Sequence, residues 1–356
     1  MANEEETVNV SSDHLHELIK NKLVLAGLPE EQAEETTNHL VYADMVGVHS
    51  HGAVRVEYYA ERISKGGVNV EPDLSFEKTG PSTGIYHGDN AQGHYVANKA
   101  LDPAIQMAKE SGVAVVGVKN VSHTGTLSYY LRKVAEKDLI GFAVTQSDPM
   151  VVPFGGAEVY YGTNPIAFSV PRTEGEPIIF DMATTVQAWG KILDARSKGK
   201  DIPDTWAVDE TGAPTTDPNK VAGLVPIAGP KGYGLMMMVD MLAGVLLGLP
   251  FGKSVSSMYH DLSEERNLGH TYIIIDPSRF RDLDEFKADV DRTVSELHAI
   301  QPAPGYDQIY YPGELSVLSL NRHREEGIDI PKSINDYLES DKVYINSYDG
   351  KGIFAD

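Results

Sequence analysis

The chain carries an unusual polar run, His49-Ser50-His51-Gly52, and its pattern admits three interpretations. Two imidazoles one residue apart can ligate zinc, although further ligands would then come from remote histidines. They can instead hydrogen-bond a polar substrate, with Arg55 about one helical turn further along. An arginine fork matches a carboxylate, so this interpretation suits a hydroxy acid. The third is structural: both histidines only cap helices and satisfy backbone groups.

A second candidate is His123, in the sequence Val121-Ser122-His123-Thr124-Gly125. It follows Val113–Val118, an apolar run rich in β-branched residues that predicts a buried strand. Reactive groups of α/β enzymes usually lie in loops at the carboxyl ends of such strands. Oxidising an alcohol requires a group that removes the hydroxyl proton, and histidine suits this task near neutral pH.

Two more polar segments end predicted strands, namely Gln146-Ser147-Asp148 and Phe180-Asp181-Met182-Ala183. Together with His123 they are consistent with one shared crevice. Each segment alone is also typical of a turn or an N-cap, because Asp, Ser and Thr are common caps.

The glycine fingerprint of the common dinucleotide-binding fold is absent from the sequence. The nearest match, Gly232-Tyr233-Gly234, lacks the third glycine and opens a predicted helix after Pro230 and Lys231. A dinucleotide would need another device for its phosphates, such as backbone N–H groups at a helix start together with Lys231. The structural alternative for Lys231 is a solvated lysine at a helix start.

Composition narrows the class of protein. Thirty basic against 52 acidic residues give a net charge of −22, which repels nucleic acid and anionic lipid. The absence of cysteine excludes disulfides, thiolate catalysis and iron–sulfur clusters, and it suits a reducing cytoplasm. The longest apolar stretch, Leu235–Leu249, is shorter than the about 20 residues of a membrane span and predicts a buried helix. The acidic first seven residues lack the features of a signal peptide. We therefore expect a cytoplasmic protein with a small-molecule substrate and with no nucleic-acid or membrane partner.

The elements that must position these residues mix helix and strand throughout, which predicts an α/β class. Three helices are expected between residues 12 and 65, with a cap at Ser12, ends at Gly27 and Gly47, a start at Pro29, and Arg55 and Tyr59 on one face of the third. Strands are expected at 84–87, 113–118, 139–145, 166–170, 177–180 and 272–275. Helices are expected at 91–110, with a kink or break at Pro103, and at 128–137, 283–299 and 331–339.

Five motifs, in this order and spacing, resemble those of the type 2 malate/L-lactate dehydrogenases. They are His49-Ser50-His51-Gly52, Ser122-His123-Thr124-Gly125, Gly162-Thr163-Asn164-Pro165, Phe180-Asp181-Met182-Ala183-Thr184 and Pro230-Lys231-Gly232-Tyr233-Gly234. The resemblance covers nearly the whole chain. Residues 49–67, 146–156 and 254–258 are similar to a subgroup of that family that oxidises ureidoglycolate in bacterial allantoin breakdown.

This resemblance implies a non-Rossmann α/β fold. We expect an N-terminal helical region (1–75) that contributes substrate residues, a mixed-sheet dinucleotide-binding region (76–320) and a C-terminal helical segment (321–356) packed back on the core. The implied reaction is oxidation of (S)-ureidoglycolate to oxalurate by hydride transfer to NAD, with NADP as the alternative cofactor. A homo-oligomer, dimeric or higher, is also implied. The alternatives are a dehydrogenase of malate, lactate or sulfolactate, a metal-dependent ureido hydrolase and, third, a non-enzymatic binding protein.

Motif positions carry expected roles onto individual residues. His123 is the expected proton acceptor, and we expect Asp148 to orient or charge-balance its imidazole. Ser50 and His51 join these two as expected catalytic residues and line the substrate end together with Arg55 and Tyr59. No metal ion is expected. The residues expected to contact the dinucleotide are Ser147, Asp181, Met182, Ala183, Lys231, Gly313, Glu314 and Leu315.

Overall fold

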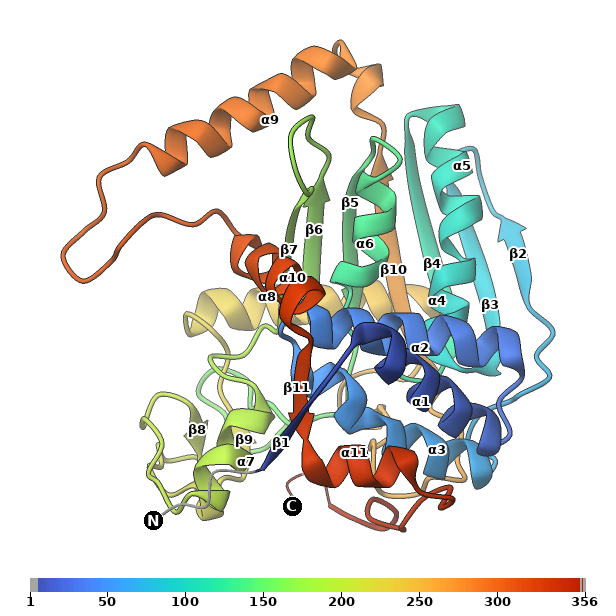
Figure 1. Ribbon diagram of the computed structural model, residues 1–356, viewed down its shortest axis with the longest axis vertical. Coiled ribbons are helices and arrows are strands. Elements are labelled where there is room, and N and C mark those ends of the chain that lie inside the picture. Colours follow the sequence, from blue (N-terminus) through green and yellow to red (C-terminus); the bar gives the residue numbers. More distant parts are fainter. Residues whose placement is uncertain (1–5, 353, 355–356) are drawn as a thin grey trace.

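A mixed seven-stranded sheet forms the centre of the computed structural model, which describes residues 6–352 and 354 (Figure 1). The strand order is β2-β3-β4-β10-β5-β6-β7. Strands β3 and β4 run parallel, whereas the other neighbouring pairs are antiparallel. The predicted α/β class with a mixed sheet is thereby confirmed. The strands are β2 (Ser75–Lys78), β3 (Thr83–Ala91), β4 (Val113–Val121), β5 (Ile140–Thr145), β6 (Ile166–Val170), β7 (Ile178–Met182) and β10 (Leu268–Ile275).

Helices cover both faces of this sheet. Ala143 and Val144 are neighbours in β5, so their side chains point to opposite faces. Ala143 belongs to a core cluster with α5 (Leu101–Ser111) and α6 (Ser128–Ala135). Val144 instead packs with Val239 and Ala243 of α8 (Pro230–Ala243). Helices α5 and α6 therefore lie on one face and α8 on the other (Figure 1). The helices that follow β3 are α4 (Gly93–Lys99), α5 (Leu101–Ser111), α6 (Ser128–Ala135), α7 (Trp189–Ser197), α8 (Pro230–Ala243), α9 (Leu283–His298), α10 (Glu314–Glu326) and α11 (Lys332–Glu339).

The two ends of the chain share a second core, below the sheet in Figure 1. Most of its buried residues come from the N-terminal helices and from Leu320 onward, and Met258 and Leu262 from the segment before β10 complete it. A two-stranded sheet ties the ends together, with Thr7 opposite Pro331 and Val10 opposite Ile328. The elements here are β1 (Thr7–Val10), α1 (Ser12–Leu25), α2 (Glu30–Met45), the 3-10 turns η1 (His49–His51) and η2 (Ala53–Arg55), α3 (Val56–Ser64) and β11 (Ile328–Pro331). A small sheet of β8 (Ala207–Val208) and β9 (Gly223–Leu224) stands apart.

Strand directions bring the candidate residues to one edge of the large sheet. Strands β4 and β5 are both antiparallel to β10, which lies between them, so they run in the same direction. Strand β7 also runs with β5, because β6 is antiparallel to both. His123 after β4, Ser147 after β5 and Asp181 near the end of β7 therefore lie along the same edge.

Three local expectations were wrong in detail. The cap of α1 is Ser11, whose hydroxyl accepts from the His14 N–H at 3.2 Å, rather than Ser12. Residues 91–110 form two helices that break at Ala100, and Pro103 sits in the first turn of α5, where its missing N–H leaves no helical bond unmade. The third helix was expected to carry both Arg55 and Tyr59. It begins at Val56, so Arg55 is the last residue of η2 and lies just before α3.

The stretch Leu235–Leu249 is not a single buried helix. Helix α8 ends at Ala243, and a 3-10 turn, η4 (Val245–Leu247), follows. One face carries buried Met236 and Val239, but the other carries exposed apolar side chains up to Leu246, which is 61% exposed. Within the described residues, none of the helices combines the length and apolar character needed to cross a membrane.

Candidate functional site

A cavity of about 1070 Å³ lies where the sheet edge meets the N-terminal layer. Its wall combines residues of η1 and η2, the loops after β4 and β5, strand β7 and the start of α10. Most residues predicted from the sequence line it, whereas Tyr59, Lys231 and Glu314 do not. The predicted residues in the wall are Ser50, His51, Arg55, His123, Ser147, Asp148, Asp181, Met182, Ala183, Gly313 and Leu315.

His123 lies at the polar end of this cavity, with its Nδ1 atom directed into the protein. The Nδ1 atom is 2.7 Å from the hydroxyl of Tyr59, which is only 1% exposed. Tyr59 therefore stands behind the histidine and not in the cavity wall, contrary to its expected place at the substrate end. The imidazole of His51 is roughly parallel to that of His123, with ring centroids 5.8 Å apart.

The surroundings of both imidazoles keep them uncharged. Burial lowers the pKa of His123 well below its usual value, and the neighbouring His51 and Arg55 lower it further. Burial likewise lowers the pKa of His51 to about 3, with Arg55 contributing. A neutral imidazole has one nitrogen free to accept a proton, so His123 is a potential proton acceptor at ordinary pH.

Arg55 presents part of its guanidinium to the cavity. Its Nε donates to the Ser50 carbonyl and its Nη1 to the Tyr259 hydroxyl, each at 2.7 Å. These two bonds fix the plane of the guanidinium. Within the described residues Nη2 makes no hydrogen bond, so it and the second N–H of Nη1 remain for an anion.

The two imidazoles of the H-x-H run face different groups. His49 Nδ1 lies 2.9 Å from Asp44, which raises the pKa of His49, while His51 faces His123. The other carboxylate oxygen of Asp44 accepts from the Ala53 N–H at 2.7 Å, so Asp44 holds the loop that carries Ser50 and His51. Among the described residues there is no group of three or more His, Asp or Glu side chains placed to hold a metal ion.

Asp148 is held away from the imidazole that it was expected to orient. Its carboxylate accepts from the Met258 N–H at 2.9 Å and lies 3.3 Å from Arg266 Nη2. It therefore ties the loop that carries Met258 and Tyr259 to the end of β5. The structure gives the orienting contact on His123 to Tyr59 instead.

The opposite end of the cavity is suited to a dinucleotide. Its walls include the apolar side chains of Ile179, Trp189, Leu193 and Leu315, on which flat rings can pack. The Asp181 carboxylate accepts a hydrogen bond from the Ser128 N–H at 2.8 Å, which joins the end of β7 to the start of α6. The volume exceeds the about 300–1000 Å³ of ordinary ligand pockets. Size, apolar walls and a separate polar end thus fit NAD together with a small acid.

Close contacts fix the backbone at Gly313, and a hydrogen bond fixes the side chain of Ser147; both residues line the cavity. Gly313 has a φ of +90°, and a Cβ there would lie 1.9 Å from the Ile179 carbonyl oxygen. Only glycine is accommodated where α10 begins against β7. The Ser147 hydroxyl accepts from the Thr163 N–H at 2.8 Å, which joins the β5 loop to the segment before β6.

Two residues that were expected to contact the cofactor, Lys231 and Glu314, lie outside the cavity wall. Lys231 is exposed in the first turn of α8, which confirms a lysine at a helix start but not a place in the cavity. Glu314 pairs with His298 at 2.9 Å and accepts from the Tyr311 N–H at 2.9 Å.

The structure adds wall residues that were not predicted. Met258 and Tyr259 line the polar end, together with Tyr348 and Lys351 from the C-terminal segment. Tyr259 directly follows the segment 254–258 that carries the subgroup resemblance, so that signal was available in the sequence. Tyr348 comes from a polar segment without any such signal; its ring stacks on Tyr259 with centroids 5.5 Å apart.

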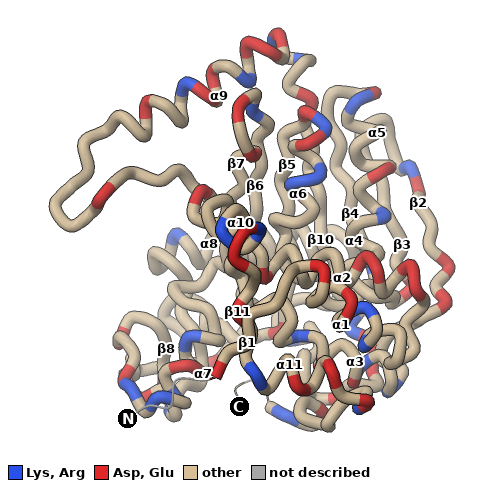
Figure 2. The backbone as a smooth tube through the Cα atoms, viewed as in Figure 1, with Lys and Arg blue, Asp and Glu red and all other residues tan. Residues whose placement is uncertain are grey.

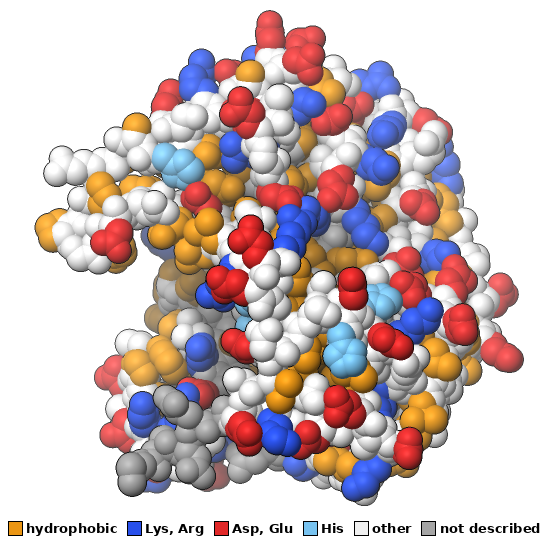
Figure 3. Space-filling model, viewed as in Figure 1, with side chains coloured by type: hydrophobic (Ala, Val, Ile, Leu, Met, Phe, Trp, Pro, Cys, Tyr) orange, Lys and Arg blue, Asp and Glu red, His pale blue; other side chains and the backbone are white. Residues whose placement is uncertain are grey.

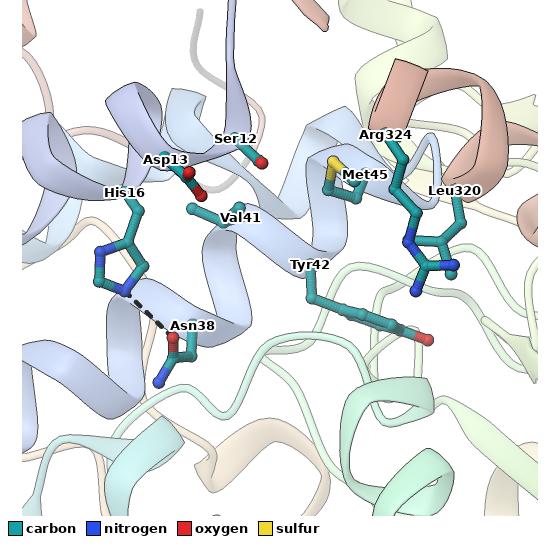
Figure 4. Close-up of a pocket in the computed structure, with 9 residues that line it drawn as sticks. All are labelled: Ser12, Asp13, His16, Asn38, Val41, Tyr42, Met45, Leu320 and Arg324. Carbon is teal, nitrogen blue, oxygen red and sulfur yellow. Dashed lines mark hydrogen bonds between the residues drawn. The ribbon is translucent and has the colours of Figure 1, made fainter. Parts of the chain in front are cut away.

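A second, open depression lies between α1, α2 and α10 (Figure 4). His16 and Asn38 are hydrogen-bonded at 3.1 Å there, and Tyr42 separates them from Arg324. No residue singled out from the sequence as a catalytic or binding candidate lines this depression.

The sequence profile described as malate/L-lactate dehydrogenase matches residues 10–339. The chain belongs to this family. It is 56% identical over 348 residues to a ureidoglycolate dehydrogenase (NAD(+)) of Escherichia coli O157:H7, covering 98% of this chain and 100% of the relative. The enzyme of the same name from strain K12 is 55% identical with the same coverage. The predicted family and the predicted subgroup resemblance are thus confirmed.

Solved structures of the family share the fold. A malate dehydrogenase from Entamoeba histolytica has a TM-score of 0.88 at 30% identity, covering 94% of this chain and 97% of that one. A sulfolactate dehydrogenase from Methanocaldococcus jannaschii has a TM-score of 0.87 at 36% identity, covering 93% and 96%. These matches confirm the predicted non-Rossmann fold.

Proposed function

We propose that this chain oxidises (S)-ureidoglycolate to oxalurate, with NAD as hydride acceptor. The observation that carries the proposal is the convergence of His123 and Arg55 at the polar end of one long cavity. High identity to the two ureidoglycolate dehydrogenases (NAD(+)) supports the substrate and the cofactor. A relative named for NADP is only 30% identical, which favours NAD here.

In the proposed mechanism Arg55 binds the substrate carboxylate through its free N–H groups. His123 takes the proton of the 2-hydroxyl group at Nε2, because its Nδ1 is occupied by Tyr59. Ser50 and His51 face the same end and hydrogen-bond the remaining polar atoms of the substrate. Asp148 contributes by holding Met258 and Tyr259 in the wall.

The cofactor is proposed to occupy the apolar end. NAD, when bound, supplies the acceptor for the hydride that leaves the substrate carbon. Its proposed contacts are Ser147, Asp181–Ala183, Gly313 and Leu315, and their presence in the cavity wall supports this role. Lys231 and Glu314 have only the family resemblance as support for a cofactor contact. Residues before 75 would then contribute Ser50, His51 and Arg55 to the substrate end. We place the reaction in the cytoplasm, with its NAD pool.

The test is a substrate panel that follows the absorbance of reduced nicotinamide. Purified protein is given (S)-ureidoglycolate, malate, lactate or sulfolactate, each with NAD and with NADP, before and after treatment with a chelator. We expect the highest kcat/KM for ureidoglycolate with NAD and no effect of chelation. A higher kcat/KM for malate or sulfolactate would identify another dehydrogenase. Breakdown of ureidoglycolate without nicotinamide reduction, lost on chelation, would identify the metal hydrolase.

We also propose that the chain forms a homo-oligomer through the exposed apolar face of α8 and η4. Exposed apolar residues cluster there, namely Met237, Met238, Met241, Val245 and Leu246. An apolar face of this kind usually marks an interface. Helix α9 and the connection after it project from the body (Figure 1), and Asp307 is the one charged residue between Ile300 and Gly313 (Figure 2). Figure 3 shows hydrophobic side chains along the hollow below this arm.

Light scattering on the eluting protein is expected to give at least twice the chain mass of 38.8 kDa. The double substitution Met241→Asp with Leu246→Asp should shift the mass toward one chain, because buried charges oppose association. Leu25, 51% exposed at the end of α1, offers a matched control in Leu25→Asp. A monomeric wild type, or an unaltered mass in the double variant, contradicts this interface.

A further inference from the structure

A line of hydrogen-bonding side chains runs from the back of His123 into the protein interior. The Tyr59 hydroxyl lies 2.7 Å from His123 Nδ1 and 3.5 Å from His94 Nε2. The Nδ1 atom of His94 is in turn 3.0 Å from the side-chain amide of Gln92. Tyr59 is 1% exposed, and His94 and Gln92 are 0% exposed. None of the three lines the cavity, so a role in the reaction would have to act through His123.

The orientation of the Gln92 amide decides the direction of every hydrogen bond in this line. If Gln92 presents its oxygen, His94 donates from Nδ1, and its Nε2 accepts the proton of Tyr59. Tyr59 then accepts from His123 Nδ1, which leaves Nε2 of His123 free to take a proton. If Gln92 presents its nitrogen, each bond reverses, and Nε2 of His123 carries the hydrogen.

The role of His123 as a base selects between these two orientations. His123 can accept a proton at Nε2 only when its hydrogen lies on Nδ1, so Tyr59 must accept from His123 and donate to His94. His94 then donates from Nδ1, which requires the oxygen of the Gln92 amide toward it. The two amide atoms are interchangeable in shape, so a half-turn of the Gln92 amide gives this arrangement.

The two imidazoles of this line, His94 and His123, are uncharged, so the line can orient hydrogen atoms but does not hold an extra proton. Burial lowers the pKa of His94 well below its usual value, as it does that of His123. The neighbours that act on these two imidazoles are neutral or positive, and they come from seven helices, turns or loops. They are His39 of α2, His51 of η1, Arg55 of η2, Tyr59 of α3, the two imidazoles themselves from α4 and the β4 loop, and Arg266 before β10.

We propose that Gln92 and His94 are positioning residues that act through Tyr59 to place the hydrogen of His123 on Nδ1. The inference rests on the proposed function for the role of His123 as a base. When His123 takes the substrate proton at Nε2, its Nδ1–H stays bonded to Tyr59. The added proton then leaves through the cavity, because the interior line ends at an amide.

The kinetic test is the isosteric substitution Gln92→Glu, measured as the pH profile of kcat/KM. A carboxylate against His94 attracts positive charge along the line and raises the proton affinity of His123. We expect the acid limb of the profile to move up by about one pH unit. Gln32→Glu is the matched control, since Gln32 is a buried amide with an unpartnered oxygen on α2, outside the cavity. Its acid limb should stay in place.

A second variant guards against misfolding of the first. Tyr59→Phe keeps the ring but cuts the line, and it should lower kcat by roughly 10-fold to 100-fold, as loss of an orienting partner does elsewhere. Its binding of NAD, measured by calorimetry, should be unchanged. An unshifted acid limb in Gln92→Glu, or full kcat in Tyr59→Phe, overturns the proposal.

The tautomer can be read directly in the substrate-free protein. Long-range proton–nitrogen NMR of protein carrying ¹⁵N-histidine distinguishes Nδ1–H from Nε2–H, and the spectrum of His123→Asn assigns the resonance among the 12 histidines. We expect Nδ1–H in the wild type and a mixture in Tyr59→Phe. Nε2–H in the wild type would overturn the inference. Nδ1–H in a protein inactive on ureidoglycolate would refute the proposed function alone.

Discussion

Replacing His123 with asparagine is expected to lower turnover by about 10²–10⁴-fold while NAD still binds. Asparagine fills a similar space and can bond Tyr59, but it cannot accept a proton from the substrate. Steady-state kinetics with ureidoglycolate give the loss, and calorimetry with NAD checks that the cavity is intact. Burial keeps the wild-type imidazole neutral, so the lost group is a ready acceptor.

The matched control is His87→Asn, since His87 is a half-exposed histidine of β3 outside the cavity. Its turnover should equal that of the wild type. Wild-type turnover in His123→Asn would remove His123 from the proton transfer. The base would then have to be sought among the other polar residues at this end of the cavity.

Replacing Arg55 with lysine is expected to raise the KM for ureidoglycolate by about 10-fold to 100-fold, with a smaller change in kcat. Lysine keeps the charge but loses the planar fork, and a charged hydrogen bond contributes about 1.5–3 kcal/mol. It also loses the bonds to the Ser50 carbonyl and the Tyr259 hydroxyl, which hold the guanidinium plane. Initial rates over a range of substrate concentrations measure both constants.

Arg281→Lys serves as the control for this exchange, because Arg281 forms surface ion pairs at the start of α9. Its KM should not move. An unaltered KM in Arg55→Lys would show that the carboxylate binds elsewhere, and Lys351, which also lines the cavity, would be the next residue to replace.

Several parts of the site could be predicted because they depend on local sequence. The apolar run that forms β4 ends just before His123, and the run that forms β5 ends just before Ser147 and Asp148. Buried strands read as continuous apolar segments, and polar residues that follow them lie at the sheet edge. Family motifs then carried the expected roles, and most of those residues do line one cavity.

Other expectations failed where a side chain's surroundings come from distant segments. Tyr59 lies near Arg55 in sequence, but its partner is His123, 64 residues away. Asp148 pairs with Arg266, 118 residues away, rather than with the imidazole that its position suggested. Hydrogen-bond partners at such separations leave no trace in a local pattern.

The sequence by itself determined the α/β class, most strands, the family, and part of the set of residues that line the cavity. Tertiary structure alone decided that β1 pairs with β11, with Val10 opposite Ile328, and that the apolar face of α8 and η4 remains exposed. It also decided that Tyr59 stands behind His123. Periodicity reports which face of an element is apolar, whereas the neighbour that covers a face, or leaves it open, depends on how the whole chain packs.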